Sequence, residues 1–415
     1  MSNNRSVMVI HWVKKILKKT VVSLLILGLG FTPIPVQTMG VASEQDPGNG
    51  QAPTPSVAWE QSYGTGDEWD YVGYGMDMTQ DGGYIITGSA RDELNDYPYG
   101  RKEMLLVMKL DDSGKKEWEK MFGVSNKDRV NYGSSIKQTS DGGYIVTGVY
   151  TPYMMSDANR PNISIPQKSM YLLKLDASGN KQWDKYFLYD GDNPESKKFY
   201  TYGNSVEETT EGGFIVSGYW EQCLDWNSGA YYWGDRSGSS AASGRMLVKT
   251  DSRGNIQWQV RRNYSEYYSA GNSKAKDVLQ TADGSYIATG AQGHLGLVGS
   301  SDDMVPVSID VTGGQGSNVG TIYYVDFVKV NGTGQIVSKK ELLKDPKEGL
   351  AIIGTSIVQN NDGYTVSAYG GALSKSYLFK TDLLGNVLWR KDFTMTQCNT
   401  MEKAQDNGYI LGGIK

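Results

Sequence analysis

Residues 219–238 bring flat aromatic side chains together with carboxylates. The segment reads YWEQCLDWNSGAYYWGDRSG, and Trp69 stands in an earlier segment of similar composition. Aromatic faces pack against the apolar faces of sugar rings, and carboxylates accept hydrogen bonds from hydroxyl groups. The same residue types form hot spots in protein interfaces. We therefore predict a binding set for a glycan or a protein, with packing of the loop onto the underlying sheet as the alternative. The set is Trp69, Trp220, Glu221, Asp225, Trp226, Tyr231, Tyr232, Trp233 and Asp235.

Catalysis is a second use for such carboxylates. A pair drawn from Glu221, Asp225 and Asp235 has the residue types that glycoside hydrolysis needs, although acids in a surface loop are usually solvated. Beyond residue 43 the chain has one histidine, His294, so a Ser/His/Asp triad or a site with several histidines has no other imidazole. DGDN at 190–193 alternates oxygen ligands but lacks the rest of a calcium loop. We predict no catalytic residue, no metal site and no cofactor.

A short motif repeats along the chain and must build the elements that position these loops. DGGYIVTG and its near-copies begin at Asp81, Asp141, Glu211, Asp283, Asp362 and Asp406. A second motif, with Lys, Asp-x-x-Gly and usually Trp, follows each of the first five copies, with Asn331 in place of Asp in the fourth. Both motifs place glycine where a tight turn needs a positive φ, and the alternating apolar residues indicate strands. Each repeat therefore predicts four short strands, A to D.

Repeated four-stranded units of this length are typical of the blades of a β-propeller. We predict an all-β fold with six blades. DGGYIVTG followed by LLKLDASGNKQW resembles the repeats of secreted bacterial β-propeller proteins and, more distantly, quinoprotein-type propeller blades. The resemblance implies that one Trp in each blade wedges against the next blade, and Ser338 replaces it in the fourth copy. The implied structural anchors are Trp118, Trp183, Trp258 and Trp389.

The first strand predicted beyond the leader resembles an isolated strand D. VAWEQSYG at 57–64 matches KQWDKYF and carries a fifth anchor, Trp59. A propeller removes exposed edges by closing its ring. We therefore expect the last blade to take strands A and B from residues 399–415 and strand D from residues 57–63, and to be incomplete because it has no strand C.

The N-terminal residues predict export. Residues 1–43 contain five basic and no acidic residues and an apolar run at 21–31, which is the pattern of a signal peptide. An uncleaved anchor is the alternative. Residues 44–56 form a Pro/Gly-rich linker, and residues 57–415 form the propeller domain. The remaining chain is acidic, which disfavours nucleic acid as a partner. We expect a secreted or cell-surface monomer without stable membrane insertion.

Two further sets of residues leave alternatives open. Cys223 and Cys398 belong to distant repeats, so they form either a disulfide or two buried thiols. Lysines on strand C line an anionic path, lie on a solvated surface, or pair structurally. These lysines are Lys109, Lys174, Lys249, Lys329 and Lys380.

The predicted function follows from the loops. The A–B and C–D turns are short, whereas the D–A and B–C connections are long and share the opposite face. We predict an exported, non-catalytic binding module that presents this long-loop face to an extracellular glycan or protein. The alternatives are a carboxylate-dependent polysaccharide-degrading enzyme, either a glycosidase or a lyase, and a structural cell-surface scaffold.

Overall fold

The chain is all-β in the part that the structure describes. The computed structural model describes residues 8–14, 21–26, 56–63, 69–92, 103–123, 131–151, 154–157, 160–166, 168–188, 198–223, 243–261, 273–296, 320–342, 352–370, 375–393, 397–403 and 408–414. These ranges contain strands and turns but no helix. They accordingly include no long apolar helix of the kind that crosses a membrane.

Five four-stranded antiparallel sheets, named here units 1 to 5, contain most of the described residues. Unit 1 is β4 (Trp69–Met78), β5 (Tyr84–Asp92), β6 (Glu103–Leu110) and β7 (Lys116–Phe122). Unit 2 is β8 (Tyr132–Gln138), β9 (Tyr144–Tyr150), β12 (Ser169–Leu175) and β13 (Lys181–Phe187). Unit 3 is β14 (Lys198–Glu208), β15 (Phe214–Cys223), β16 (Ser243–Thr250) and β17 (Ile256–Arg261). Unit 4 is β18 (Ser273–Gln280), β19 (Tyr286–Gly296), β20 (Gly320–Val330) and β21 (Ile336–Glu341). Unit 5 is β22 (Ile352–Asn360), β23 (Gly363–Gly370), β24 (Lys375–Asp382) and β25 (Val387–Phe393).

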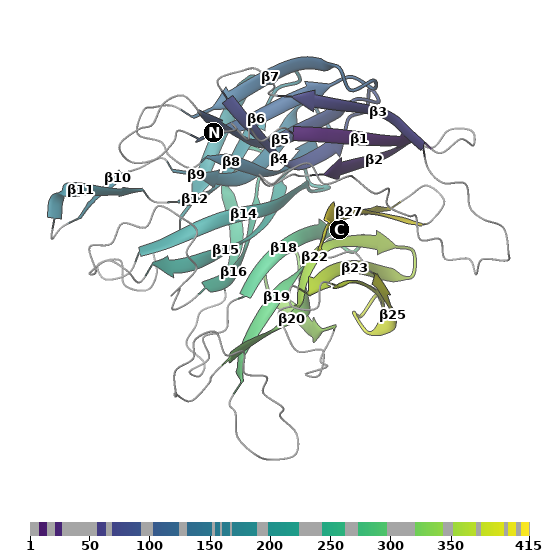
Figure 1. The fold of residues 1–415 in the computed structure, drawn as a ribbon. Helices are drawn as coiled ribbons and strands as arrows, with labels where there is room; N and C mark the ends of the chain where they lie inside the picture. The colour runs from purple at the N-terminus through teal and green to yellow at the C-terminus, as the bar shows by residue number, and fades with distance from the viewer. Residues whose placement is uncertain are drawn as a thin grey trace, which may run out of the picture.

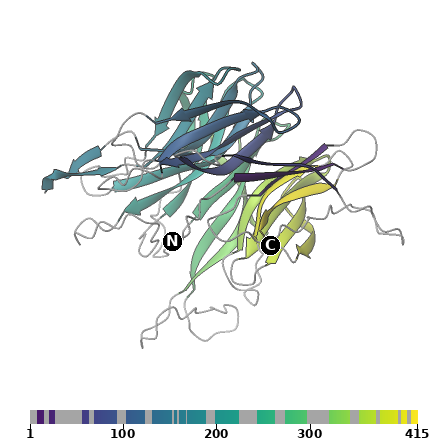
Figure 2. The ribbon, with the colours of Figure 1, turned by 45° about the horizontal axis from the view of Figure 1, so that its top comes forward.

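The units follow one another side by side in chain order (Figures 1 and 2). The first strand of each unit lies next to the first strand of the following unit, from β4 through β8, β14 and β18 to β22. Each first strand also packs on the second strand of the preceding unit. The outer strands β7, β13, β17, β21 and β25 pair only with the third strand of their own sheet. The first strands are therefore the inner strands, and we use this name below.

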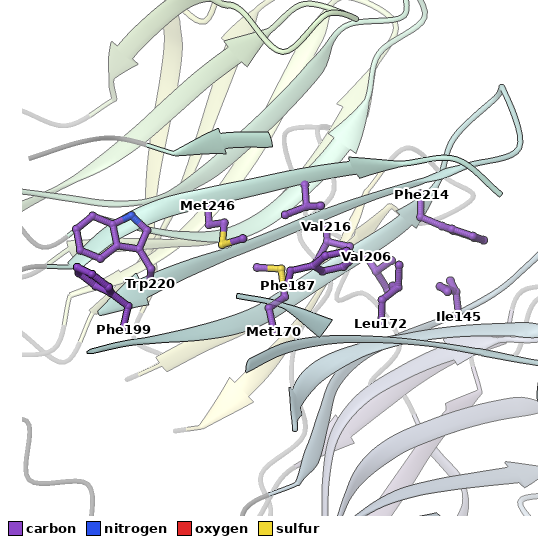
Figure 3. Packing of buried hydrophobic residues seen from close by; sticks show 11 residues of the cluster. Ile145, Met170, Leu172, Phe187, Phe199, Val206, Phe214, Val216, Trp220 and Met246 are labelled. Carbon is purple, nitrogen blue, oxygen red and sulfur yellow. The ribbon is translucent and has the colours of Figure 1, made fainter. Parts of the chain in front are cut away.

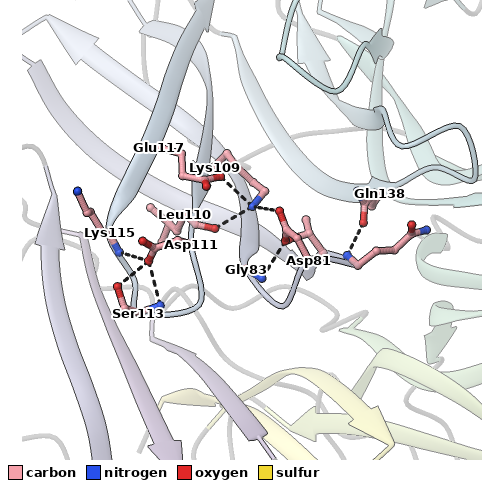
Figure 4. A network of polar contacts seen from close by, with 11 residues as sticks. Asp81, Gly83, Lys109, Leu110, Asp111, Ser113, Lys115, Glu117 and Gln138 are labelled. Carbon is pink, nitrogen blue, oxygen red and sulfur yellow. Dashed lines mark hydrogen bonds and ion pairs between the residues drawn. The ribbon is translucent and has the colours of Figure 1, made fainter.

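The repeated DGG motif forms the first hairpin turn of each unit. In unit 1 the amide of Gly82 donates to the carbonyl of Thr79 over 2.9 Å, and Gly82 has a φ of 83°. A left-handed backbone of this kind favours glycine. In the second turn, the Asp111 carboxylate accepts hydrogen bonds from the amides of Ser113 and Lys115 at 2.9 Å (Figure 4). Both motifs are thus local turn devices, as the sequence predicts.

The lysines on the third strands pair with the acids of the DGG turns. Lys109 Nζ lies 2.8 Å from Asp81 and 3.0 Å from Glu117, and it donates to the carbonyl of Leu110 (Figure 4). Three other units contain the corresponding pairs Lys174–Asp141, Lys329–Asp283 and Lys380–Asp362, at 2.9, 2.7 and 2.6 Å. In unit 3, Lys249 donates instead to the carbonyl of Thr250 and the side chain of Gln257. Of the three uses considered for these lysines, structural pairing is the one observed.

Tryptophans on the outer strands pack against the following unit. Trp118 of unit 1 meets Tyr144 of unit 2 edge to face, with 5.8 Å between ring centres. A methyl group on Gly179, in the second turn of unit 2, would lie 2.6 Å from the Trp118 ring. Trp258 meets Tyr286 edge to face in the same way, and Trp183 packs on Phe214 in a tilted contact. The glycine in each second turn therefore gives the indole room to pack.

Unit 4 replaces this contact with a different aromatic residue. Ser338 stands opposite Lys329 in the sheet register, where the other units have Trp. Phe327, from the neighbouring strand β20, lies 5.4 Å from Tyr364 of unit 5 and fills the space beside Gly385. The side chain is 1% exposed, so the missing indole leaves no open edge at this position. An aromatic contact between units is therefore kept although its residue has moved to another strand.

The hydrophobic core lies between neighbouring units as well as within them. One buried cluster joins Ile145, Met170, Leu172 and Phe187 of unit 2 to side chains of unit 3 (Figure 3). The unit 3 members are Phe199, Val206, Phe214, Val216, Trp220, Met246 and Val248. Burial of these side chains stabilises the stacking of one sheet on the next, by about 25 cal/mol per Å² of apolar surface.

The last copy of the DGG motif forms a two-stranded sheet, named unit 6. It consists of β26 (Gln397–Lys403) and β27 (Tyr409–Ile414). β26 packs on β23 of unit 5, and Thr365 of that strand donates to the Tyr409 hydroxyl over 2.7 Å. Unit 6 therefore continues the series of units.

The N-terminal strands differ from our expectation. Residues 57–63 lie in β3 (Ser56–Tyr63), which pairs with β1 (Met8–Lys14) and not with unit 6. β1 also pairs with β2 (Val21–Ile26), and β2 lies beside β27. The described residues thus show no closed ring, and the expected placement of residues 57–63 as strand D of the last blade is wrong. A lone strand carries no turn that fixes its partner, so its pairing is weakly specified by local sequence.

Cys398 is a free thiol in the structure. The side chain is buried, and burial is the main cause that raises its pKa to about 11. Of the two states considered for Cys223 and Cys398, the buried thiol is the one observed at Cys398, while the side chain of Cys223 lies outside the described part.

Candidate ligand-binding site

The predicted binding set falls largely outside the described residues. Asp225, Trp226, Tyr231, Tyr232, Trp233 and Asp235 all belong to this undescribed part. Trp69 lies in β4, but its side chain is not among those described. The binding role of these residues stays a prediction.

The structure describes two members of the set at the end of β15. Trp220 is 2% exposed and meets Phe199 edge to face with 5.5 Å between ring centres. The Trp220 ring therefore belongs to the core between units 2 and 3 and offers a ligand almost no surface. Glu221, the next residue, is partly exposed and accepts a hydrogen bond from the Tyr202 hydroxyl. The carboxylate of Glu221 is thus at the edge of an aromatic group.

Two tyrosines form the centre of this aromatic group. Tyr202 of β14 and Tyr219 of β15 are paired in the sheet register, and their rings stack with 4.5 Å between centres and an interplanar angle of 7°. Both residues lie at the end of the hairpin away from the DGG turn, which is the end that faces the long connections. Burial, followed by the charge of Glu221, raises the pKa of Tyr202, so the hydroxyl remains a donor.

Tyrosines of the two preceding units lie near this pair. Tyr74 of unit 1 and Tyr132 of unit 2 have ring centres 5.4 Å apart. The strands that carry Tyr132 and Tyr202, β8 and β14, lie side by side. Tyr74 is 36% exposed, and Tyr132 and Tyr219 are partly exposed. We call Tyr74, Tyr132, Tyr202 and Tyr219 the aromatic band.

Two lysines lie over rings of the aromatic band. Lys274 of unit 4 lies over the ring of Tyr219, with 4.3 Å from Nζ to the ring centre. Lys168 lies over Tyr202 at 5.5 Å and over Tyr200 at 5.8 Å. Ammonium groups at these distances are attracted to the negative face of the ring. The band therefore combines ring faces, one carboxylate and positive charge on strands from four units.

The local backbone explains why these side chains approach one another. Tyr132 and Tyr202 each precede a glycine in the inner strand, and a methyl group on either glycine would collide with a threonine of the preceding unit. Gly133 faces Thr87, and Gly203 faces Thr147. Glycine at this position lets each inner strand lie directly on its neighbour, which brings the adjacent tyrosine to the border between units.

A second group of charges lies nearer the DGG turns of the inner strands. Lys137 Nζ lies 3.5 Å from Asp77 and 3.4 Å from Glu207, which belong to the units on either side. The charge of Glu207 is the main cause that raises the pKa of Lys137, against burial, and Asp77, Glu402 and Asp277 add to it. Asp277 accepts hydrogen bonds from Ser205 of unit 3 and Ser356 of unit 5. This inner polar group therefore links neighbouring units. Among the described residues there is no cluster of His, Cys, Asp and Glu suited to a metal ion.

Sequence reasoning missed the aromatic band because it searched the loops. Each inner strand has a small residue, Gly or Ala, just before its bulge. The position directly before this small residue, called the slot below, varies from unit to unit. The residues are Val72, Tyr132, Tyr202, Lys274 and Ile353. An alignment of the repeats would show this slot, because Tyr or Lys occupies it in units 2 to 4 and an aliphatic residue occupies it in units 1 and 5.

Comparison with known proteins gives distant structural similarity. No family model and no curated protein matches the chain. Among solved structures, a protein of unknown function from Bacteroides caccae is similar over 84% of this chain and 90% of its own, with 13% identity and a TM-score of 0.39. A GH93 alpha-L-arabinofuranosidase of Fusarium graminearum in complex with arabinobiose covers 82% of this chain and 86% of its own, with 12% identity and a TM-score of 0.45. A calcium-binding protein, regucalcin, from Agrobacterium tumefaciens covers 80% and 78%, with 12% identity and a TM-score of 0.36. Scores at this level assign no activity.

Proposed function

We propose that the protein is an exported, six-bladed β-propeller that binds an extracellular glycan without catalysis. Units 1 to 5 would be complete blades and unit 6 part of the last one. The ligand would lie on the long-loop end of the inner strands. The observation that carries the proposal is the aromatic band with Glu221 beside it. Flat rings suit the apolar face of a sugar, and a carboxylate accepts hydrogen bonds from its hydroxyl groups.

The geometry favours sugars over a flat protein contact. Tyr74, Tyr132 and Tyr219 come from three successive units and are partly exposed, so they present a series of rings and not one compact hot spot. The predicted residues of 219–238 would extend the same face, since Trp220 and Glu221 at the end of β15 lead into them. Export and a monomeric state are part of the proposal. Export is supported by the charge and apolar pattern of residues 1–43.

The test is glycan binding by variants of the band. The purified protein would be applied to a glycan array and a panel of soluble plant and bacterial polysaccharides. Tyr219→Ala removes a ring stacked on Tyr202, and Tyr132→Ala removes one that contacts Tyr74. Loss of one aromatic contact with the ligand costs about 1 kcal/mol, so each variant is expected to bind about fivefold more weakly and the double variant more than tenfold.

Tyr186→Ala is the matched control. Tyr186 is 38% exposed and packs at a tilt against Tyr150 and Tyr171, but it lies on the outer strand of unit 2. Its variant should bind like the parent protein. Equal binding by the double variant and the parent, with both folded by circular dichroism, would show that the band is not the site. Turnover of a polysaccharide that disappears in Glu221→Gln would replace the proposal with the enzymatic alternative.

A further inference from the structure

Unit 4 has two lysines on its inner strand, whereas the repeated lysines of the chain lie on the third strands. Lys274 and Lys276 lie on the inner strand β18, and both are partly buried. Lys276 occupies the bulge between Ala275 and Asp277, where the register of β18 against β19 shifts. The corresponding bulge residue of unit 1 is Tyr74, a member of the aromatic band. Lys276 therefore belongs to the same region of the inner strands as the proposed glycan site.

The charge of Lys276 is not neutralised within the described ranges. The lysines of the third strands each have a carboxylate, an amide oxygen or a carbonyl within hydrogen-bond distance. Lys276 has no such contact among the described residues, and the only charge that affects it there is Lys274. Burial first, and the Lys274 ammonium second, lower the pKa of Lys276 to about 8.

The nearest acid along the strand is already occupied. Asp277 Oδ1 accepts from Ser205 over 2.7 Å, and Oδ2 accepts from Ser356 and from the amide of Ile357 at 2.9 Å. These bonds hold the Asp277 carboxylate between units 3 and 5. Asp277 does not serve as a counter-ion for Lys276.

Lys274 links this positive charge to the aromatic band. Its ammonium group lies over Tyr219, which stacks on Tyr202, and Tyr202 donates to Glu221. A ligand bound at the band would lie beside the Lys274 ammonium group, and Lys276 lies two residues further along the same strand. A partly buried ammonium without a counter-ion is costly, and a bound anion removes this cost.

We propose that Lys274 and Lys276 recognise an anionic substituent, either a carboxylate or a sulfate, on the sugar rings of the ligand. The inference rests on the proposed glycan binding and narrows it to acidic polysaccharides. Lys168, which lies over the ring of Tyr202, adds to the positive potential at the band. Neutral glycans would use the same rings and lack the charge contact.

The experiment compares charged and neutral polymers of the same backbone. The parent protein would be titrated with polygalacturonate and its carboxyl-reduced form, and with dextran sulfate and dextran. At least one charged polymer should bind about tenfold more tightly than its neutral counterpart, as expected for hydrogen bonds to a charged group. A preference for polygalacturonate indicates a carboxylate ligand, and one for dextran sulfate indicates a sulfated ligand.

The variants assign the preference to the lysines. Lys274→Gln combined with Lys276→Gln should reduce the preference to about twofold or less. Lys276→Arg keeps the charge and should retain the preference. Lys115→Gln combined with Lys391→Gln removes two exposed charges elsewhere and should bind like the parent protein.

Each remaining outcome decides a different question. Equal binding of charged and neutral polymers would overturn this inference and leave the proposed glycan binding intact. A preference that persists in the folded double Gln variant would also overturn it. If the parent protein binds no glycan on the array or among these polymers, the proposed function itself fails.

Discussion

Replacement of Asp141 by Asn tests whether the DGG motif is a structural device. Asp141 accepts hydrogen bonds from the Thr139 hydroxyl at 2.5 Å and the Gly143 amide at 3.0 Å. It also lies 2.9 Å from Lys174 Nζ. The Lys174 side chain is 6% exposed, whereas that of Asp141 is 54% exposed. Asn retains Oδ1, which accepts from Thr139, Gly143 and Lys174. It loses the negative charge and the hydrogen bond from the buried Lys174 ammonium to Oδ2.

The expected cost follows from these contacts. A hydrogen bond to a charged group contributes about 1.5–3 kcal/mol, and the exposure of Asp141 places this one at the lower end. Asp141→Asn should therefore lower the free energy of unfolding by about 1.5 kcal/mol. Asp141→Ala also removes two neutral hydrogen bonds and should lower it by about 3 kcal/mol. Urea unfolding followed by tryptophan fluorescence measures both values, with Asp112→Asn, at an exposed turn position, as the control.

The pH dependence gives an independent check. Burial of Asp141 opposes its ionisation, but the hydrogen bonds from Thr139, Lys174 and Gly143 outweigh it and lower the pKa to about 2. Because the folded pKa lies below the value of 3.8 for a free Asp side chain, this stabilisation is present above pH 3.8 and is lost as the pH falls towards 2. The difference between the parent protein and Asp141→Asn should be full at pH 7 and smaller at pH 2.5.

A double-mutant cycle completes this test. Lys174→Met removes the ammonium while keeping an unbranched side chain in the same space. The coupling between Asp141→Asn and Lys174→Met should be about 1 kcal/mol or more. Such cycles have a usual error of about 0.3–0.5 kcal/mol. A free energy of unfolding of Asp141→Asn within about 0.3 kcal/mol of the parent would refute the reasoning that the pair stabilises the turn. A coupling near zero would refute it as well.

Two further predictions concern the turns and the thiol. Gly179→Ala should destabilise by about 2–4 kcal/mol, because φ is +77° and the new methyl group would lie 2.6 Å from the Trp118 ring. Gly142→Ala is the control, because φ is +79° and no atom lies within 4 Å of the new methyl group, so it should cost only about 1 kcal/mol. Similar losses of unfolding free energy for the two variants in urea would contradict the role of Gly179 in making room for the indole. Cys398, with a pKa raised to about 11 mainly by burial, should react with iodoacetamide at pH 8 at least about tenfold more slowly in the folded protein than in urea. Labelling at the unfolded rate would show that the thiol is not buried.

The repeated elements could be predicted because their determinants are local. Asp, Gly and the alternating apolar residues fix the turns and strands within about eight residues. The first five copies of DGGYIVTG or its variants lie at strand pairs in the structure, and the described part of the sixth copy leads into β27. Contacts between units were harder to predict. The absence of Trp at Ser338 is visible in the sequence, but its replacement by Phe327 from the adjacent strand depends on how two sheets pack.

The N-terminal pairing and the site show where local reasoning ends. Residues 57–63 have the pattern of an outer strand, yet their partner depends on which other strands are available, and β3 pairs with β1. Trp220 has the residue type of a ligand platform, but the burial of its ring follows from its position on the face of β15 that meets unit 2. Burial of this kind depends on a neighbour that lies far away in the sequence.

The inner strands indicate why the repeats need not share a chemistry. The slot before the small inner-strand residue places a side chain at the border between two units, whatever that residue is. Tyr132 and Tyr202 supply ring faces from this slot, and Lys274 supplies positive charge one unit further on. Val72 and Ile353 occupy it in units 1 and 5, so the polar part of the slot series is confined to units 2 to 4. The repeated turns therefore set the geometry of the slot. Its side chains change from aromatic in units 2 and 3 to cationic in unit 4. The proposed ligand would accordingly lie with its sugar rings on units 2 and 3 and its anionic groups towards unit 4.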